Sequence, residues 1–241
     1  MGHYFGYKPD KLDTRDFIYK PTLAVEKLPT MVDLRKTCSP VRDQGQLGSC
    51  TWQSMVGFRE FQERLTDDKF IPLSVLFGYY NTRVDEGTED EDSGCYLRDC
   101  WKQLQKVGTC ANKYWPYDIS VFDEKPSDEA YASSIWKITT YHRLNTLTDV
   151  KTHLVEGLPV VIGFTVYESF ENIGSDGVMP MPTAWESVLG GHAVVVVGYD
   201  DSKKWFIVRN SWGNSWGDAG YFYMPYEFVT PNDVSDMWAA V

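Results

Sequence analysis

The chain has 241 residues, of which 43% are hydrophobic and 15% aromatic, and it carries a formal net charge of −11. This charge would repel the phosphates of nucleic acid and an anionic membrane surface, so neither is an expected partner. No apolar run approaches the ~20 residues of a membrane span. We expect a soluble monomer with one large domain or two lobes that share an interface.

Residues 1–27 are polar and rich in turn-forming residues, and they show no strong hydrophobic period. They predict an extension that lies on the main body of the protein. The segment lacks the basic stretch and the apolar core of a secretory signal. We therefore expect an intracellular protein or a trimmed secreted form.

The first predicted helix begins at a cysteine. Apolar residues recur at three- and four-residue steps from about 50 to 65, and Ser49 can cap the first turn. Cys50 is thereby placed at a helix N-terminus.

Two more helices are expected in the first half of the chain, over 73–83 and over 97–107. Gly108 would end the second of them in a left-handed conformation. The acidic run 85–92 lies between the two helices and is interpreted as a solvated loop rather than a metal site. The first half is therefore predicted to be mainly helical.

The second half predicts strands. Segment 135–144 is rich in β-branched and aromatic residues, 148–156 is typical of a short helix stopped by Gly157, and 159–166 is an apolar strand. A loop rich in glycine and proline, 167–191, precedes two more strands. The pattern indicates an α+β protein with a helical lobe followed by a β-rich lobe.

The last two strands, 193–199 and 204–209, are joined by the turn 200–203. A hairpin symmetric about that turn would place His192 opposite Asn210, within roughly 4.5 to 5.5 Å between Cβ atoms. The amide oxygen of Asn210 could then accept a hydrogen bond from the imidazole. The other ring nitrogen would remain free to face a thiol.

Cys50 needs activation, because the thiolate is the nucleophile and a free thiol has a pKa near ~8.5. A helix N-terminus favours the thiolate, and His192 as an imidazolium would hold it in an ion pair. The side chain of Gln44 and the N–H of Cys50 can donate to the charge that develops on an attacked carbonyl oxygen. Trp212 can shield the histidine and its amide partner from water.

Three segments together resemble the papain-like cysteine proteases, in the family's order of cysteine, histidine and asparagine. They are Gln44-Gly45-x-x-Gly48-Ser49-Cys50, Gly191-His192-Ala193-Val194 and Asn210-Ser211-Trp212-Gly213. The separation between cysteine and histidine is near the ~130 to 150 residues that the general description of this family gives. The resemblance runs from about residue 28 to the end.

The resemblance implies a helical left lobe over about 28–130 and an antiparallel, β-barrel-like right lobe over about 131–241. The active-site cleft would lie between the two lobes, with a substrate peptide extended in it. The expected activity is that of a cysteine peptidase, an endopeptidase, acting on peptides or proteins without a cofactor or a metal. Residues 1–27 are expected to be a pro-segment that lies on the cleft.

By the same resemblance, Cys50 is the nucleophile that forms a thioester and His192 is the general base and acid. Asn210 orients the histidine, and Gln44 completes the oxyanion hole. The substrate-binding residues are then expected to be Gly94, Gly191 and Trp212.

The chain also departs from the animal and plant members of the family. Leu47 stands where those enzymes usually carry a disulfide-forming cysteine, and the usual Gly-Gly pair of the cleft wall is absent at Gly94-Cys95. These departures resemble a divergent bacterial and viral branch. The other four cysteines could be free or could pair in three ways, and they are Cys38, Cys95, Cys100 and Cys110.

Several alternatives remain open at this point. Residues 1–27 could instead be a structural arm on the back of the molecule. Either the loop 174–190 or residues 1–27 could plug the cleft of an exopeptidase. The thioester could pass its acyl group to an amine, as in an acyltransferase, or the fold could serve deamidation. The fold could also be a binding module with a vestigial site.

Overall fold

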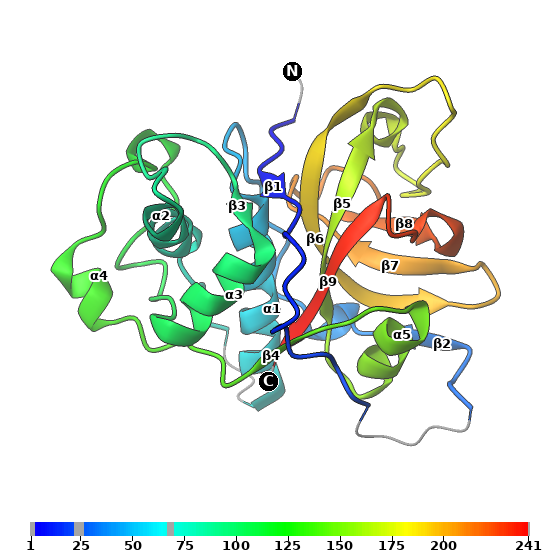
Figure 1. Ribbon diagram of the computed structural model, residues 1–241, viewed down its shortest axis with the longest axis horizontal. Helices are drawn as coiled ribbons and strands as arrows, with labels where there is room; N and C mark the ends of the chain where they lie inside the picture. The colour runs from blue at the N-terminus through cyan, green and yellow to red at the C-terminus, as the bar shows by residue number, and fades with distance from the viewer. Residues whose placement is uncertain (1–2, 22–26, 67–69, 241) are drawn as a thin grey trace.

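The computed structural model describes residues 3–21, 27–66 and 70–240. Figure 1 shows helices on one side, a twisted sheet on the other, and the N-terminal segment running along the seam between them. The sheet is antiparallel throughout, and the helices are segregated from it. This architecture confirms the predicted α+β class and the two-lobed arrangement.

The helical lobe is built around α1 (Cys50–Thr66), which is buried along most of its length. α2 (Val75–Glu86) approaches it closely, because a Cβ atom on Gly78 would lie 2.1 Å from the ring of Trp52. The other elements of the lobe are α3 (Leu97–Lys106), α4 (Asp128–Ala132), β3 (Cys95–Tyr96) and the 3-10 helices η1 (Arg35–Thr37) and η2 (Ile119–Val121).

The ends of these helices follow local sequence chemistry. The hydroxyl of Ser74 accepts a hydrogen bond from the N–H of Phe77 and caps α2. Gly108 (φ 86°) and Gly157 (φ 88°) adopt the left-handed conformation expected after a helix. Ser49 does not cap α1 with its side chain, because its hydroxyl bonds to Tyr117.

The β lobe contains one sheet with the strand order β4-β9-β5-β6-β7-β8, and β2 pairs with β6 beside this path. Its strands are β2 (Met31–Asp33), β4 (Tyr141–Arg143), β5 (Val160–Tyr167), β6 (Val188–Asp200), β7 (Trp205–Arg209), β8 (Tyr221–Pro225) and β9 (Val234–Ala240). α5 (Leu147–Val155), η3 (Glu168–Asn172) and η4 (Tyr226–Phe228) complete it.

β6 joins the two hydrophobic cores. Ala193, Val195 and Val197 pack into the core that includes α1, whereas Val194 and Val196 face the interior of the β lobe. Since successive side chains of a strand point to opposite faces, a strand buried on both faces needs a continuous apolar run. This explains why the sequence shows no polar alternation here.

Two predicted elements differ from the structure. Only Tyr141–Arg143 of segment 135–144 forms a strand, paired with β9, while Trp136 makes an isolated bridge to Thr109. β-forming composition did not suffice for the rest of that segment, which has no continuous partner strand. The loop expected over 167–191 is shorter, because β6 begins at Val188.

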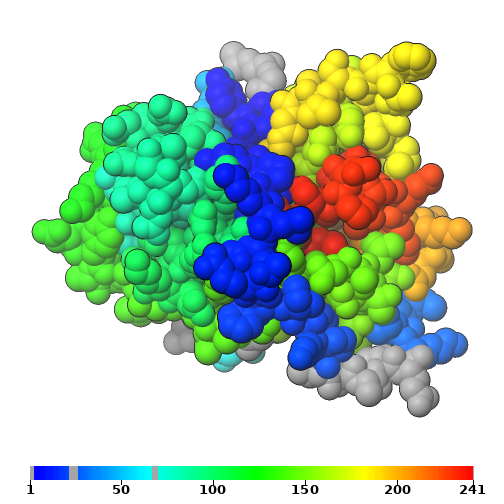
Figure 2. Space-filling view, in the orientation of Figure 1, coloured from blue at the N-terminus to red at the C-terminus, as the bar shows by residue number. Residues whose placement is uncertain are grey.

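The N-terminal residues 3–19, called the strap below, lie along the seam between the lobes, as Figure 2 shows from one face. β1 (Tyr7–Lys8) pairs in parallel with β3 of the helical lobe. Ile18 bridges to Arg143 at the edge of the β lobe. Of the predicted extension 1–27, residues 1, 2 and 22–26 lie outside the described residues.

Among the helices of the described residues, none combines the length and the apolar character that crossing a bilayer requires.

Candidate active site

Cys50 is the first residue of α1 and is completely buried. Burial raises the pKa of its thiol to about 11, although the backbone N–H groups of Ala193, Gly6 and Thr51 interact with the sulfur and oppose this shift. Ala193 belongs to the β lobe and Gly6 to the strap. The thiol therefore lies where the helical lobe, the β lobe and the strap meet.

His192 and Asn210 are joined by a hydrogen bond of 2.7 Å between Nε2 and Oδ1. The other ring nitrogen of His192, Nδ1, is buried and has no hydrogen-bond partner among the described residues. The ring of Trp212 stacks on the imidazole at a centroid distance of 4.9 Å. This arrangement fixes the ring and leaves one nitrogen available for proton transfer.

This hydrogen bond forms although the predicted register of the hairpin, with His192 directly opposite Asn210, is wrong. A bulge between Val196 and Gly198 shifts the register of β6 and β7, and Val195 pairs with Arg209. Continuing that register places Asn210 opposite Val194, which is two residues from His192. The two side chains therefore meet across the diagonal, a separation that long polar side chains can span.

The charge state of the pair also differs from the expected ion pair. Burial lowers the pKa of His192 to about 4, and the bond from Asn210 offsets only part of this effect. Together with the raised pKa of Cys50, this favours a neutral imidazole and a neutral thiol. The physical reason is that neither side chain is exposed beneath the strap.

Gln44 is fully buried, and its side-chain amide is held at both ends. Its Oε1 accepts a hydrogen bond of 2.6 Å from the hydroxyl of Ser211. Its Nε2 donates to the carbonyl oxygens of Leu47 at 2.9 Å and of Tyr4 at 3.0 Å. The amide nitrogen predicted to face an oxyanion thus donates one of its two hydrogen bonds to a carbonyl oxygen of the strap.

The three predicted substrate-binding residues all contact the strap. A Cβ atom on Gly94 would lie 2.1 Å from the carbonyl oxygen of Gly6, and one on Gly191 would lie 2.4 Å from that of Tyr7. Trp212 stacks on His3 with a centroid distance of 3.7 Å and an interplanar angle of 7°. The surface expected to receive a peptide therefore already holds one.

Comparison with known proteins agrees with this geometry. The model of the papain family cysteine protease matches residues 28–235. A peptidase C1-like protein of Acanthamoeba polyphaga mimivirus is 38% identical over 97% of this chain and 85% of its own length. The chain belongs to the papain family of cysteine proteases.

Two further relatives of this family are informative. Xylellain, a cysteine protease from Xylella fastidiosa, is 40% identical, with a TM-score of 0.89 and coverage of 98% of this chain and 95% of its own. The cathepsin B-like CP3 of Giardia intestinalis is 32% identical over 86% of this chain and 73% of its own length. The predicted family and its bacterial and viral branch are confirmed.

The five thiols of this family member are all free. Leu47, at the position of the usual cysteine, is buried in the core beside Cys50. No group of side chains with the make-up of a metal site occurs in residues 3–21, 27–66 and 70–240.

Sequence reasoning missed two residues that shape the site. Ser211 holds the amide of Gln44, a role that its position directly after Asn210 could have suggested. Asp92 accepts hydrogen bonds from the N–H of Gly48, at 3.0 Å to each oxygen, and from the hydroxyl of Tyr79 at 2.5 Å. Asp92 lies in the acidic run 85–92, which is interpreted from the sequence as a solvated loop. The charge of this run does not indicate that one of its carboxylates contacts the loop before Cys50.

Proposed function

We propose that this papain-family chain hydrolyses peptide bonds, with Cys50 as nucleophile, His192 as base and acid, Asn210 as its orienting partner and Gln44 in the oxyanion hole. The observation that carries the proposal is the His192–Asn210 hydrogen bond. It uses one ring nitrogen and leaves Nδ1 without a partner among the residues that the structure describes, while the Cys50 sulfur interacts with the backbone of the next residue, Ala193.

In the proposed reaction, the Cys50 sulfur bonds to the carbonyl carbon of the substrate while its proton passes to His192. The resulting oxyanion accepts hydrogen bonds from Nε2 of Gln44 and the N–H of Cys50. His192 then gives its proton to the leaving amine, and a thioester remains on the sulfur. Water, deprotonated by His192, releases the acid and restores the thiol.

We further propose that the strap is an inhibitory pro-segment. The carbonyl oxygen of Tyr4 accepts from Nε2 of Gln44, where the substrate oxyanion would bind. A Cβ atom on Gly6 would lie 1.6 Å from the carbonyl oxygen of Gly48, so only glycine fits at this point beside the nucleophile loop. A substrate and residues 3–7 cannot occupy this surface together.

The experiment compares peptide hydrolysis before and after the strap is released. A recognition sequence for a site-specific protease is placed between Pro21 and Lys27, and the folded full chain is then cut there. We expect hydrolysis to rise at least tenfold after the cut, and to be lost in the same protein with Cys50→Ala. Hydrolysis that persists in Cys50→Ala contradicts the assignment of the nucleophile, and equal rates before and after the cut contradict the inhibitory role.

A further inference from the structure

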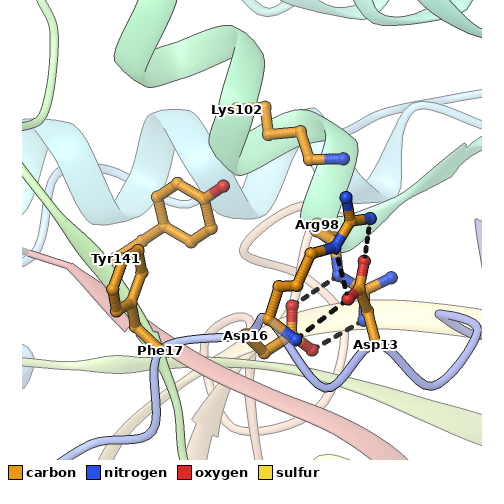
Figure 3. A pocket seen from close by; sticks show the side chains of 7 residues that line it. Asp13, Asp16, Phe17, Arg98, Lys102 and Tyr141 are labelled. Atoms are coloured by element: carbon orange, nitrogen blue, oxygen red, sulfur yellow. Dashed lines mark hydrogen bonds and ion pairs between the residues drawn. The ribbon is translucent and has the colours of Figure 1, made fainter.

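The strap is also held at a second place, by residues that are not among those proposed to be catalytic. Asp16 receives two hydrogen bonds from Arg98 of α3, at 2.8 Å from Nε and 2.7 Å from Nη2, and a third at 3.2 Å from Nε of Arg143. Figure 3 shows this contact beside a pocket of about 280 Å³ that Lys102 and Tyr141 also line. Charge-assisted hydrogen bonds from two guanidinium groups to one carboxylate are a strong form of recognition.

Asp10 is held at the same place by the body of the protein. Its carboxylate accepts from the backbone N–H of Arg98 at 3.1 Å and from the indole N–H of Trp238 at 2.9 Å. Nη2 of Arg143 lies 3.6 Å from it. Both guanidinium groups lie over the ring of Trp238, with Arg143 at 4.8 Å and Arg98 at 5.7 Å from its centroid.

The backbone adds a second element of recognition. β4 is the edge strand of the sheet. Beyond Asp16 the strap lies along it, with the N–H of Arg143 donating to the carbonyl of Phe17 at 2.7 Å and the N–H of Tyr19 donating to the carbonyl of Arg143 at 2.8 Å. An extended peptide that adds to a sheet edge is a common mode of peptide binding.

The charges show what this place would bind when the strap is absent. The body contributes Arg98, Arg143 and one carboxylate, Asp236, which is already bonded to Arg143 at 2.5 Å. The two further carboxylates come from the strap. Without them, the two guanidinium groups would outnumber the one remaining carboxylate, in a protein whose formal net charge is −11.

We propose that Arg98, Arg143, Trp238 and the edge of β4 form a second peptide-binding site, separate from the catalytic centre, that recognises an extended polypeptide segment with a carboxylate where the strap has Asp16. In the closed protein the occupant is residues 10–19. After release of the strap, the site takes a carboxylate-bearing extended segment of a protein substrate, a step that rests on the proposed peptidase function. The site thus serves both to hold the strap and to retain substrates.

The test measures binding alone, so that it does not depend on catalysis. The full-length protein carries Cys50→Ala together with Asp16→Asn, which removes from its own strap the carboxylate that Arg98 and Arg143 hold. The probe is a fluorescent synthetic peptide of residues 8–20, which lacks the residues that contact Gln44 and His192. Its dissociation constant is measured by fluorescence anisotropy at fixed salt.

We expect the probe to bind, and an Asp16→Asn version of it to bind at least tenfold more weakly. An Asp13→Asn version is the matched control, because Asp13 bonds to Arg15 within the strap itself. Arg98→Gln in the protein should weaken binding of the unchanged probe as much as Asp16→Asn in the probe does. Arg59→Gln in the protein should leave this binding unchanged. The proposal is overturned if the probe does not bind, or if the Asp16→Asn and Asp13→Asn peptides bind equally well.

Discussion

The carbonyl oxygen of Tyr4 lies 3.0 Å from Nε2 of Gln44, which also donates to Leu47, while Ser211 donates to Oε1 of the same amide. One hydrogen bond thus connects the N-terminal strap with the proposed oxyanion hole. Any change that loosens the strap should free this amide, and any change that turns the amide should impair catalysis without loosening the strap. The predictions below separate these two effects.

Loss of one hydroxyl group should loosen the strap. The hydroxyl of Tyr7 donates to Asp236 and lies 2.9 Å from Ser235, both on β9. Hydrogen bonds to charged groups contribute about 1.5–3 kcal/mol, so Tyr7→Phe should raise the peptidase activity of the full chain about tenfold or more. Tyr4→Phe is the control, because the Tyr4 side chain is exposed. Equal activity in Tyr7→Phe and Tyr4→Phe would show that this anchor does not hold the strap.

Docking of the strap should weaken as the pH rises. Burial, together with the nearby Asp236, raises the pKa of Asp10 to about 7 from an ordinary value near 3.8. The docked strap therefore keeps a proton that a released strap loses between about pH 4 and pH 7, so docking loses stability across this window and changes little above it.

Hydrogen exchange of the strap amides in a Cys50→Ala background measures this effect, after correction for the intrinsic pH dependence of exchange. We expect protection to fall from pH 4 to pH 7, and to vary much less in Asp10→Asn. Protection that increases with pH over this range would contradict the predicted weakening of strap docking.

Ser211 is predicted to act through Gln44 rather than on the substrate. Ser211→Ala removes the donor to Oε1 and lets the amide turn, so kcat should fall about tenfold while KM changes little. Alkylation of Cys50 by iodoacetamide forms no oxyanion, and its rate should therefore stay the same. An equal fall in kcat and in the rate of alkylation of Cys50 would instead indicate general damage to the site.

A larger side chain at Gly78, where α1 and α2 are in contact, should lower the stability of the protein. A Cβ atom on Gly78 would meet the ring of Trp52 at 2.1 Å. Gly78→Ala should cost about 1–3 kcal/mol from overpacking, despite the better helix propensity of alanine. Gly174→Ala, whose Cβ would meet its nearest atom at 3.6 Å, is the control. Chemical unfolding of the two variants gives the comparison, and equal stabilities would contradict the packing argument.

The sequence was sufficient for α1, α2, α3 and α5, because these helices depend on local patterns, but not for the short helix α4. Cys50 begins a helix as expected from the apolar spacing over 50–65, although residues 50–58 are buried on every side. His192 and Asn210 were predicted to meet and do, although through a bulged register that no local signal revealed.

Long-range contacts could not be predicted in the same way. The role of Asp92 depends on Gly48, which is 44 residues away, and that of Arg98 depends on Asp16, which is 82 residues away. The strap also contacts Cys50 through Gly6 and His192 through Phe5, so the neutral forms of Cys50 and His192 could not be foreseen from their neighbours in sequence.

The most direct measurement is the labelling of Cys50 by an epoxide inhibitor of cysteine proteases, located by mass spectrometry. The protein is the full chain with the protease site between Pro21 and Lys27, carrying Asp16→Asn to help release the strap, before and after the cut. We predict one adduct, at Cys50, that forms at least tenfold faster after the cut and disappears in His192→Ala. An adduct at any of the other four cysteines, no adduct at all, or equal rates before and after the cut would contradict the account.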